Sequence, residues 1–376
     1  MRIDAEIASH SLIRITCVVH HFLARKVSDR LLELGIHSGW VESARSVRFR
    51  VRTRFMGIPW RSAETHDSPM DVFRVAVPPA AAGRVMSALT DAAELRTPGH
   101  GMLYAQDIVE YSRFKPVAVE PDSESVSGRL RDMVLCTCIL SMAGSGEHLA
   151  RIVLDLGAGV PVISGAIGTG IRNRMGLLRI TISPEKEVVR LMIPSHDAVG
   201  IRRILIEGGR LNRPGGGFLY QTPIREGVID PLLRIGRQEH AASMEQMIAA
   251  LDEIKGTTAW RKRYAGIGDR PEDLARRMRR HYRELTFACT EGHAEQMVQT
   301  AMSSGAEGAT ISRARAMHAG NENPDERTAA REIGVLCVPV RRSDAVWNAL
   351  CDAAAKCDDS GFRVQVMEAP AVFSYQ

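Results

Sequence analysis

The feature that most constrains this chain is a pattern that occurs three times along its 376 residues. In each copy an apolar strand-like segment ends at a proline, an amphipathic helix-like segment follows, and a turn leads into another strand-like segment. The prolines and the turn residues that lie 20 positions after them are Pro78 and Pro98, Pro194 and Pro214, and Pro339 and Asp359. Such a chain is expected to fold as three similar units.

The segment before each pattern also repeats. Strand-like residues 13–17, 134–138 and 285–289 each end in a cysteine and precede a helix-like segment that ends at a glycine. These glycines are Gly35, Gly157 and Gly305. Glycine is typical after the last helical residue because it adopts the left-handed backbone conformation at little cost. We expect Cys17, Cys138 and Cys289 at one equivalent position, as buried, reduced thiols without a metal.

Each unit reads strand, helix, strand, variable loop, strand, helix, strand. This βαββαβ order is the ferredoxin-like pattern, in which helices cover one face of an antiparallel sheet. We therefore predict an α+β protein of three tandem ferredoxin-like units arranged as a pseudo-trimer. The expected boundaries are unit one at 1–125, unit two at 126–231, a helical basic insert or linker at 232–283, and unit three at 284–376.

The insert is the most basic stretch of the chain. It contains an amphipathic helix-like segment at 240–256 and a second one that begins at Pro271. Two interpretations remain open, a solvated linker helix or an arm that docks on an acidic partner or a nucleic acid.

Composition narrows the function classes. Hydrophobic residues make up 45% and charged residues 25%, as in globular proteins, and no stretch has the roughly 18 apolar residues of a membrane-spanning helix. The first residues contain no apolar signal segment, and seven cysteines, an odd number, favour a reducing compartment. We expect a cytoplasmic protein without a membrane span. A net charge of +5 and 5% aromatic residues make nucleic-acid binding an unfavoured function.

The turn of unit two is the strongest candidate binding site. Gly215, Gly216 and Gly217 are consecutive, and Arg210 and Arg213 precede them. Successive glycines allow backbone N–H groups to turn toward an anion, and arginines add charge-assisted hydrogen bonds. The alternative is a tight turn before a strand, where glycine is common anyway.

Other clusters allow both a structural and a functional interpretation. The glycines of 165–170 suit a loop base or the wall of a binding cleft. Arginines at positions 45, 48, 50, 52 and 54 suit a solvated hairpin or a contact surface for an anion or partner. His20 and His21 have no partners at metal-ligand spacing, so we expect a surface pair and no metal site.

We find no catalytic motif. The chain has no Walker loop, nucleophile elbow or HExxH sequence. Glu64, His66, Asp67 and Asp71 could be combined into an acid–base site, but a variable polar loop explains them more simply.

The order of elements and the placement of glycines resemble the PII nitrogen-regulatory signalling family. Segment 305–311 is similar to the family's G-x-x-G-M-T-V, and 168–173 is similar to the G-F-G-R-Q at the base of its T-loop. Segment 209–218 is similar to the Gly-rich B-loop, of which 98–102 is a weaker copy. The resemblance covers the chain apart from its ends and the insert.

This resemblance implies adenine-nucleotide binding in clefts between units and control of a partner transporter or metabolic enzyme through mobile loops. ATP, ADP or AMP would be an effector, and no cofactor would be required. The implied nucleotide- or anion-binding residues are Gly209, Arg210, Arg213, Gly215, Gly216, Gly217, Gly168, Gly170, Arg172, Gly99, Gly101, Gly308 and Thr310.

The chain departs from the family at the B-loop lysine that would meet phosphate, where Gly101, Gly217 and Phe362 stand in the three units. The turn of unit three, 357–361, is acidic and would repel phosphate. We therefore expect one or two working clefts, or none. Three functions remain open: a non-enzymatic PII-like sensor, a scaffolding pseudo-trimer with inactive clefts, and an enzyme built on the same ring.

Because one chain supplies all three units, we predict that the protein is monomeric in solution. Light scattering should give the 41.3 kDa mass of a single chain. An obligate trimer of full-length chains would contradict the prediction.

Overall fold

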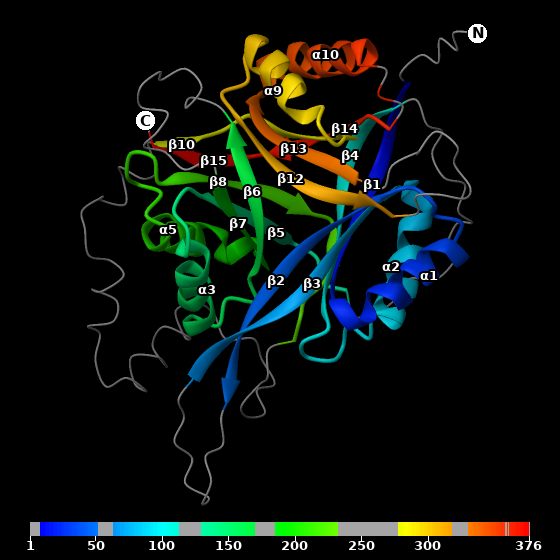
Figure 1. Ribbon diagram of the computed structural model, residues 1–376. Helices are drawn as coiled ribbons and strands as arrows, with labels where there is room; N and C mark the ends of the chain where they lie inside the picture. Colours follow the sequence, from blue (N-terminus) through cyan, green and yellow to red (C-terminus); the bar gives the residue numbers. More distant parts are fainter. Residues whose placement is uncertain are drawn as a thin grey trace, which may run out of the picture.

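The computed structural model describes residues 8–51, 63–112, 129–169, 185–231, 277–317, 330–357, 359 and 361–375. These residues form a mixed α+β protein whose strands are mostly antiparallel (Figure 1). Most of the insert, residues 232–276, lies outside the described part, and so does the first of its expected helices. The end of the second expected helix is described, and there Met278–Arg279 form a strand where the sequence predicted a helix. None of the described helices combines the length and the apolar character that crossing a bilayer requires.

The elements fall into three groups, which we call units one, two and three. Unit one contains β1 (Ala8–His20), α1 (Ala24–Glu33), β2 (Trp40–Val51), β3 (Ala63–Val77), α2 (Ala82–Ala92) and β4 (Gly101–Ser112). Unit two contains β5 (Met133–Leu140), α3 (Ser145–Asp155), β6 (Val162–Thr169), β7 (Glu185–Pro194), α5 (Ala198–Gly208), β8 (Gly217–Ile224) and β9 (Glu226–Val228). Unit three contains β10 (Met278–Arg279), β11 (Tyr282–Thr290), α9 (Ala294–Ser303), β12 (Ala309–Ala316), β13 (Ala330–Pro339), α10 (Val340–Lys356), β14 (Arg363–Ala369) and β15 (Ala371–Ser374).

The strand order is the same in each unit. The first strand lies in the middle and pairs with the third and fourth, and the second strand pairs with the third, giving β4-β1-β3-β2, β8-β5-β7-β6 and β14-β11-β13-β12. Each unit has a separate hydrophobic core in which helix and strand side chains pack together. Val85, Met86 and Leu89 of α2 are buried in the first of these cores.

The helix ends also match the sequence prediction. Gly35, Gly157 and Gly305 have positive φ angles of 74°, 66° and 111°, in the left-handed region that glycine tolerates. Each therefore ends the first helix of its unit as expected.

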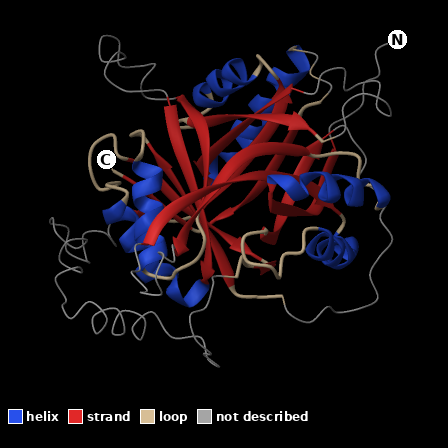
Figure 2. Ribbon diagram, turned by 60° about the horizontal axis from the view of Figure 1, so that its bottom comes forward, coloured by secondary structure: helices blue, strands red, loops and turns tan. Residues whose placement is uncertain are grey.

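The units contact each other through the same pairing in every case. Trp40, Val162 and Thr310 are equivalent, because each lies opposite the residue four positions before its repeat proline. The residue six positions after each of them pairs with the next one, as Ser46 with Val162, Gly168 with Thr310, and Ala316 with Trp40. The last strand of each unit also reaches a neighbour: β9 pairs with β4, β15 with β8, and the end of β4 with β14. The three units therefore contact one another in a closed cycle, with the strands gathered inside and the helices around them (Figure 2).

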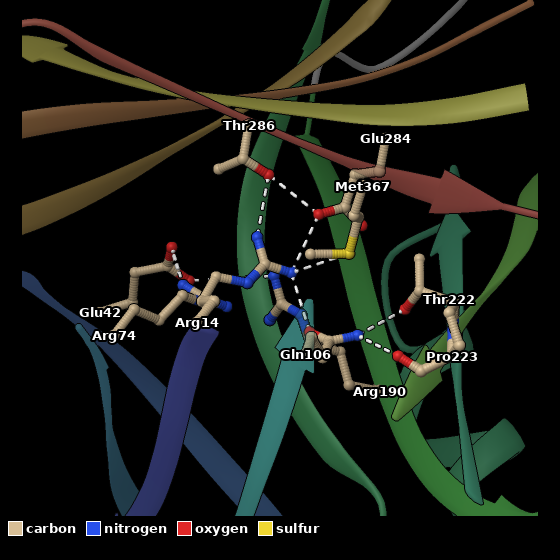
Figure 3. Close-up of polar contacts among 10 residues, drawn as sticks. All are labelled: Arg14, Glu42, Arg74, Gln106, Arg190, Thr222, Pro223, Glu284, Thr286 and Met367. Atoms are coloured by element: carbon tan, nitrogen blue, oxygen red, sulfur yellow. Dashed lines mark hydrogen bonds and ion pairs between the residues drawn. The ribbon is translucent and has the colours of Figure 1, made fainter. Parts of the chain in front are cut away.

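A buried polar network lies where the strands of the three units meet (Figure 3). Arg14 Nη2 donates to Gln106 Oε1 at 3.0 Å and forms an ion pair with Glu284 Oε1 at 3.1 Å. Arg14 Nη1 donates to Thr286 Oγ1 at 3.3 Å, and Gln106 Nε2 donates to Thr222 Oγ1 at 2.9 Å. One guanidinium thus contacts unit three directly and unit two through Gln106.

A second buried carboxylate lies beside this network. Glu42 of β2 accepts a hydrogen bond from Arg74 and lies 3.8 Å from Nη2 of Arg190, which belongs to unit two. Burial by itself would raise the pKa of Glu42, but the charges of Arg74 and Arg190 outweigh it and hold this pKa below its ordinary value of 4.5. For Glu284, burial is likewise outweighed, chiefly by the charge of Arg14, and its pKa is also lowered.

We predict that Arg14→Met and Glu284→Gln each lower the free energy of unfolding by about 3–5 kcal/mol, because each leaves a buried partner uncompensated. The double variant Arg14→Met/Glu284→Gln should lose less than the sum of the two, since neither charge remains. Urea unfolding measures both effects. As a control, Arg225→Met removes an exposed ion pair with Asp107 and should change little.

The pH dependence of unfolding gives a second readout for the same pair. The pKa of Glu284 is lower in the folded chain, so the unfolded chain binds this proton first as the pH falls. The stabilisation is therefore present above the ordinary value of 4.5 and is lost as the pH falls below it. A Glu284→Gln variant with an unchanged acid-unfolding profile would contradict the assignment.

Candidate functional site

The Gly-rich turn of unit two joins the end of α5 to the start of β8. Arg210, Gly215 and Gly217 have φ angles of 53°, 70° and 137°, so the backbone reverses sharply over this segment. The N–H of Gly216 donates to the carbonyl oxygen of Arg213 at 3.0 Å, and the N–H of Ser141 donates to the carbonyl of Gly216 at 3.3 Å. The turn is thus held against the end of β5.

Two of the three glycines are required by close backbone contacts. A Cβ atom at Gly216 would lie 2.2 Å from the carbonyl oxygen of Arg210, and one at Gly217 would lie 2.0 Å from that of Ile139. Gly215 differs, because nothing lies within 4 Å of its Cβ position. The structural interpretation of the glycine run therefore accounts for Gly216 and Gly217, while Gly215 lies at the exposed tip.

A cavity of about 230 Å³ lies beside this turn. It is lined by Ala143, Gly144, Ser145, His148, Gly208, Gly209 and Arg210, so it lies between the first residues of α3 and the end of α5. Arg210 and Arg213 are exposed, and within the described residues neither guanidinium forms an ion pair. Two exposed arginines and a cavity therefore lie at one Gly-rich turn.

The corresponding turn of unit one is occupied by a carboxylate. The N–H of Gly99 donates to Oδ1 of Asp230 at 3.0 Å, and Arg48 of β2 forms an ion pair with the same carboxylate. Asp230 comes from unit two, two residues after β9. Gly101 opens β4, where a Cβ atom would lie 1.9 Å from the carbonyl oxygen of Val18.

The turn of unit three contains its own carboxylate. Asp359 accepts hydrogen bonds from the N–H and Oγ1 of Thr290 and from the N–H of Gly361, at 2.8, 3.0 and 3.1 Å. Its Oδ2 also lies 3.1 Å from Nδ1 of His293. This aspartate is buried, so it is part of the local structure of the turn.

The other predicted site residues form a separate group. Gly168 and Thr310 pair with each other across β6 and β12, and Gly308 lies just before β12. In the sheet, β5 and β7 lie between this group and the Gly-rich turn on β8. Gly170 and Arg172 lie outside the described residues.

An interior cavity lies between units two and three, beside Thr310. Its volume is about 10 Å³, and its polar lining residues include Ser164, Arg190 and Tyr220. A space of this size holds about one water molecule. An adenine ring does not fit there in this conformation.

The sequence analysis assigned Asp71 to a variable polar loop, but Asp71 lies in strand β3. It also missed that a carboxylate recurs seven residues before each repeat proline, at Asp71, Glu187 and Glu332. Each contacts the beginning of the first helical segment of its unit. Asp71 Oδ2 lies 2.6 Å from Nδ1 of His21, Glu187 accepts from the N–H of Gly146, and Glu332 accepts from two N–H groups before and within α9. These acids satisfy or neutralise helix starts, as expected for negative groups at that end. The only sequence signal was an acid at the same position of each repeat.

The arginines of β2 are bound by the chain itself. Arg45 forms ion pairs with Asp67 and with Glu187 of unit two, and Arg48 pairs with Asp230. Of the predicted contact surface, these two side chains therefore contact another unit of the same chain. The side chain of Arg50 and all of residues 52 and 54 lie outside the described part.

The cysteine prediction is right about burial and wrong about equivalence. Strand pairing with the residue before each repeat proline defines equivalent positions. Val77, Ile193 and Val338 pair with Ile13, Val134 and Arg283. Four positions further come Cys17, Cys138 and Phe287, so Cys289 lies two residues beyond the equivalent position. A shift of two keeps a side chain on the same face of a strand, and all three thiols are buried, each in the core of its own unit.

No protein-family model and no curated protein matches this chain. In the part of the chain that the structure describes, no group of three or more His, Cys, Asp and Glu side chains is arranged to hold a metal ion. The arrangement at the unit-two turn is instead suited to binding an anion, through two guanidinium groups beside a Gly-rich backbone.

We predict that Cys17 and Cys138 react slowly with iodoacetamide in the native protein and that elemental analysis finds no stoichiometric metal. Burial raises the pKa of Cys17 to about 12 and raises that of Cys138 well above 9.0, so little thiolate is available. Cys357, which is partly exposed, serves as the internal control. Mass-spectrometric mapping that found equal labelling rates at Cys17 and Cys357 would contradict this.

Proposed function

We propose that this chain is a regulatory protein similar to the PII family, built as three ferredoxin-like units in a pseudo-trimer. In this proposal the cleft of unit two binds a phosphate-bearing effector, and the Gly-rich turn 209–217 receives its phosphate groups. Binding there changes the contacts of the protein with a partner, a transporter or a metabolic enzyme.

The repeated register between units supports the architecture. Ser46 lies six residues after Trp40 and pairs with Val162, and Gly168 lies six residues after Val162 and pairs with Thr310. Each unit also extends its last strand to a neighbour. This is the arrangement expected if three copies of one unit, each contacting the next through the same surfaces, were fused into one closed ring.

The observation that carries the proposal is the difference between the three turns. A carboxylate occupies the turn of unit one through Asp230 and that of unit three through Asp359. An internal carboxylate competes with any external anion for the same donors. The turn of unit two has two exposed arginines and a cavity of about 230 Å³ instead, which favours it as the working site.

The cavity sizes favour a small anion, or a nucleotide held by its phosphates, over a fully enclosed nucleotide. The 230 Å³ cavity is smaller than the roughly 300–1,000 Å³ of pockets that enclose a drug-sized ligand. The interior cavity beside Thr310, about 10 Å³, is far smaller still. We therefore propose that the phosphates of ATP, ADP or AMP enter the turn while the rest of the molecule lies over the surface.

A scaffolding pseudo-trimer is the second candidate function. The occupied turns of units one and three and the closed interior between units two and three favour it. The two functions differ in one measurable property, because a scaffold with inactive clefts binds none of these anions.

We predict that Gly215→Asp weakens pyrophosphate and ATP binding at least about tenfold, while Gly215→Asn retains most of it. The position has φ of +70° and open space, and Asp and Asn are the side chains that best tolerate such a backbone. The two variants have nearly the same shape and differ in charge, so they separate repulsion from sterics. Calorimetric titration gives the affinities, and Arg210→Ala should also weaken binding.

A thermal-shift screen tests the sensor itself. A ligand at 100 times its dissociation constant should stabilise the protein by about 2.7 kcal/mol. Equal affinities of the Asp and Asn variants would reject the turn as the site. Absence of any shift with pyrophosphate, ATP, ADP or AMP would reject the sensor in favour of the scaffold. Gly216→Asp is a poorer test, because its Cβ atom would collide with the carbonyl of Arg210.

A further inference from the structure

The turn of unit one brings together three distant parts of the chain. Gly99 belongs to the turn, Arg48 to β2, and Asp230 to the segment that follows β9 of unit two. The carboxylate of Asp230 accepts the N–H of Gly99 at 3.0 Å and forms an ion pair with Arg48. An anionic group is therefore bound in this turn by a backbone donor and a guanidinium group.

This carboxylate is well shielded from solvent. The side chain of Asp230 is 3% exposed and that of Arg48 is 18% exposed. Burial lowers the pKa of Arg48 to about 10, which shows that the surroundings by themselves disfavour its charge. At a pKa of about 10 the guanidinium still carries its charge at neutral pH, and the carboxylate of Asp230 lies beside it. A guanidinium combined with backbone N–H groups is a combination that proteins use to bind phosphate as well as carboxylate.

The turns of units one and two can be compared, and only the turn of unit one receives a carboxylate from the next unit. Val228 of β9 pairs with Leu103, and Phe373 of β15 pairs in the same way with Leu219. Two residues further along lie Asp230 in the first case and Tyr375 in the second. The strand that pairs with unit one is thus followed by an aspartate, and the strand that pairs with unit two is followed by a tyrosine.

The segment that delivers Asp230 has a small pairing area. Strand β9 has three residues, and its described pairings are with β4 and with Leu130 through Gly227. Few backbone hydrogen bonds therefore have to break for Asp230 to leave the turn.

We propose that the turn of unit one is a second oxyanion site, which Asp230 occupies as a built-in competitor. A phosphate group binds between Gly99 and Arg48 when this carboxylate is removed or displaced. The inference rests on the proposed function only in assuming that these turns recognise phosphate. It predicts that Asp230, which lies outside the turn, determines how many phosphate groups the chain binds.

The test measures inorganic phosphate binding by calorimetry in the full-length chain. Asp230→Ala removes the carboxylate and makes room, and Asp230→Asn removes the charge but keeps an acceptor for Gly99. We expect Asp230→Ala to bind one more phosphate per chain than the unmodified protein does. Its affinity for phosphate at this turn should be at least about tenfold higher than that of the unmodified protein. The Asn variant should show a weaker gain, because its side chain still fills the turn.

Two further variants locate the new site. Arg48→Met added to Asp230→Ala should abolish the additional phosphate, because the guanidinium is lost. Asp107→Ala removes an exposed carboxylate paired with Arg225 and changes the net charge equally, so it should add no site. If Asp230→Ala is unstable by itself, phosphate should raise its melting temperature, and it should not do so for the variant that also lacks Arg48.

The outcomes separate this inference from the proposed function. An unchanged phosphate stoichiometry in Asp230→Ala, with no thermal stabilisation, would overturn the inference even if unit two binds its ligand. A single site in Asp230→Ala and none in the unmodified protein would support the inference and reject unit two as the working cleft. Introducing Gly215→Asp into Asp230→Ala should leave the new site intact.

Discussion

Arg14 and Glu284 form their ion pair at the point where strands from all three units meet. The guanidinium also binds Thr286 and Gln106, and Gln106 continues to Thr222, so the contacts extend from unit one into units three and two. A buried charge is costly unless it is paired and its hydrogen bonds are satisfied. The buried charge of Arg14 is therefore satisfied only when all three units surround it.

This pair also bears on why the three copies have different sequences. The strand pairing makes Arg14, Leu135 and Glu284 equivalent. Each is the residue after the one that pairs with the position before the repeat proline. A ring of three identical chains would place three arginines or three glutamates together, and like charges at short distance repel. A single chain with three different copies can place one cation, one anion and one apolar residue at these positions, and a buried ion pair becomes available. The stability of the centre is then tied to differences between the units.

The same divergence decides the chemistry of the turns. The turns that begin at Pro98 and Pro214 have similar glycine patterns, and Gly101 and Gly217 are both required by a carbonyl oxygen of the neighbouring strand. They differ in their own side chains, because Arg210 and Arg213 of unit two stand where unit one has Glu94 and Thr97, and also in what reaches them from the next unit. In unit one this is the carboxylate of Asp230, which is 131 positions away from Gly99 in the chain. In unit two the turn keeps two exposed arginines and an adjoining cavity.

Local features of the fold could be predicted from the sequence, because they depend on residues close together in the chain. Proline and glycine spacing indicated three copies of one element order, and the glycines that end the first helices have the positive φ angles expected of them. The sequence also indicated that Cys17, Cys138 and Cys289 are buried, although the strand register shows that Phe287 holds the equivalent place in unit three. Which group occupies the turn of unit one, and which charges meet at the centre, were decided by pairings between residues more than a hundred positions apart, such as Gly99 with Asp230 and Arg14 with Glu284. Those contacts follow from the closed contacts between units, and no local propensity specifies them.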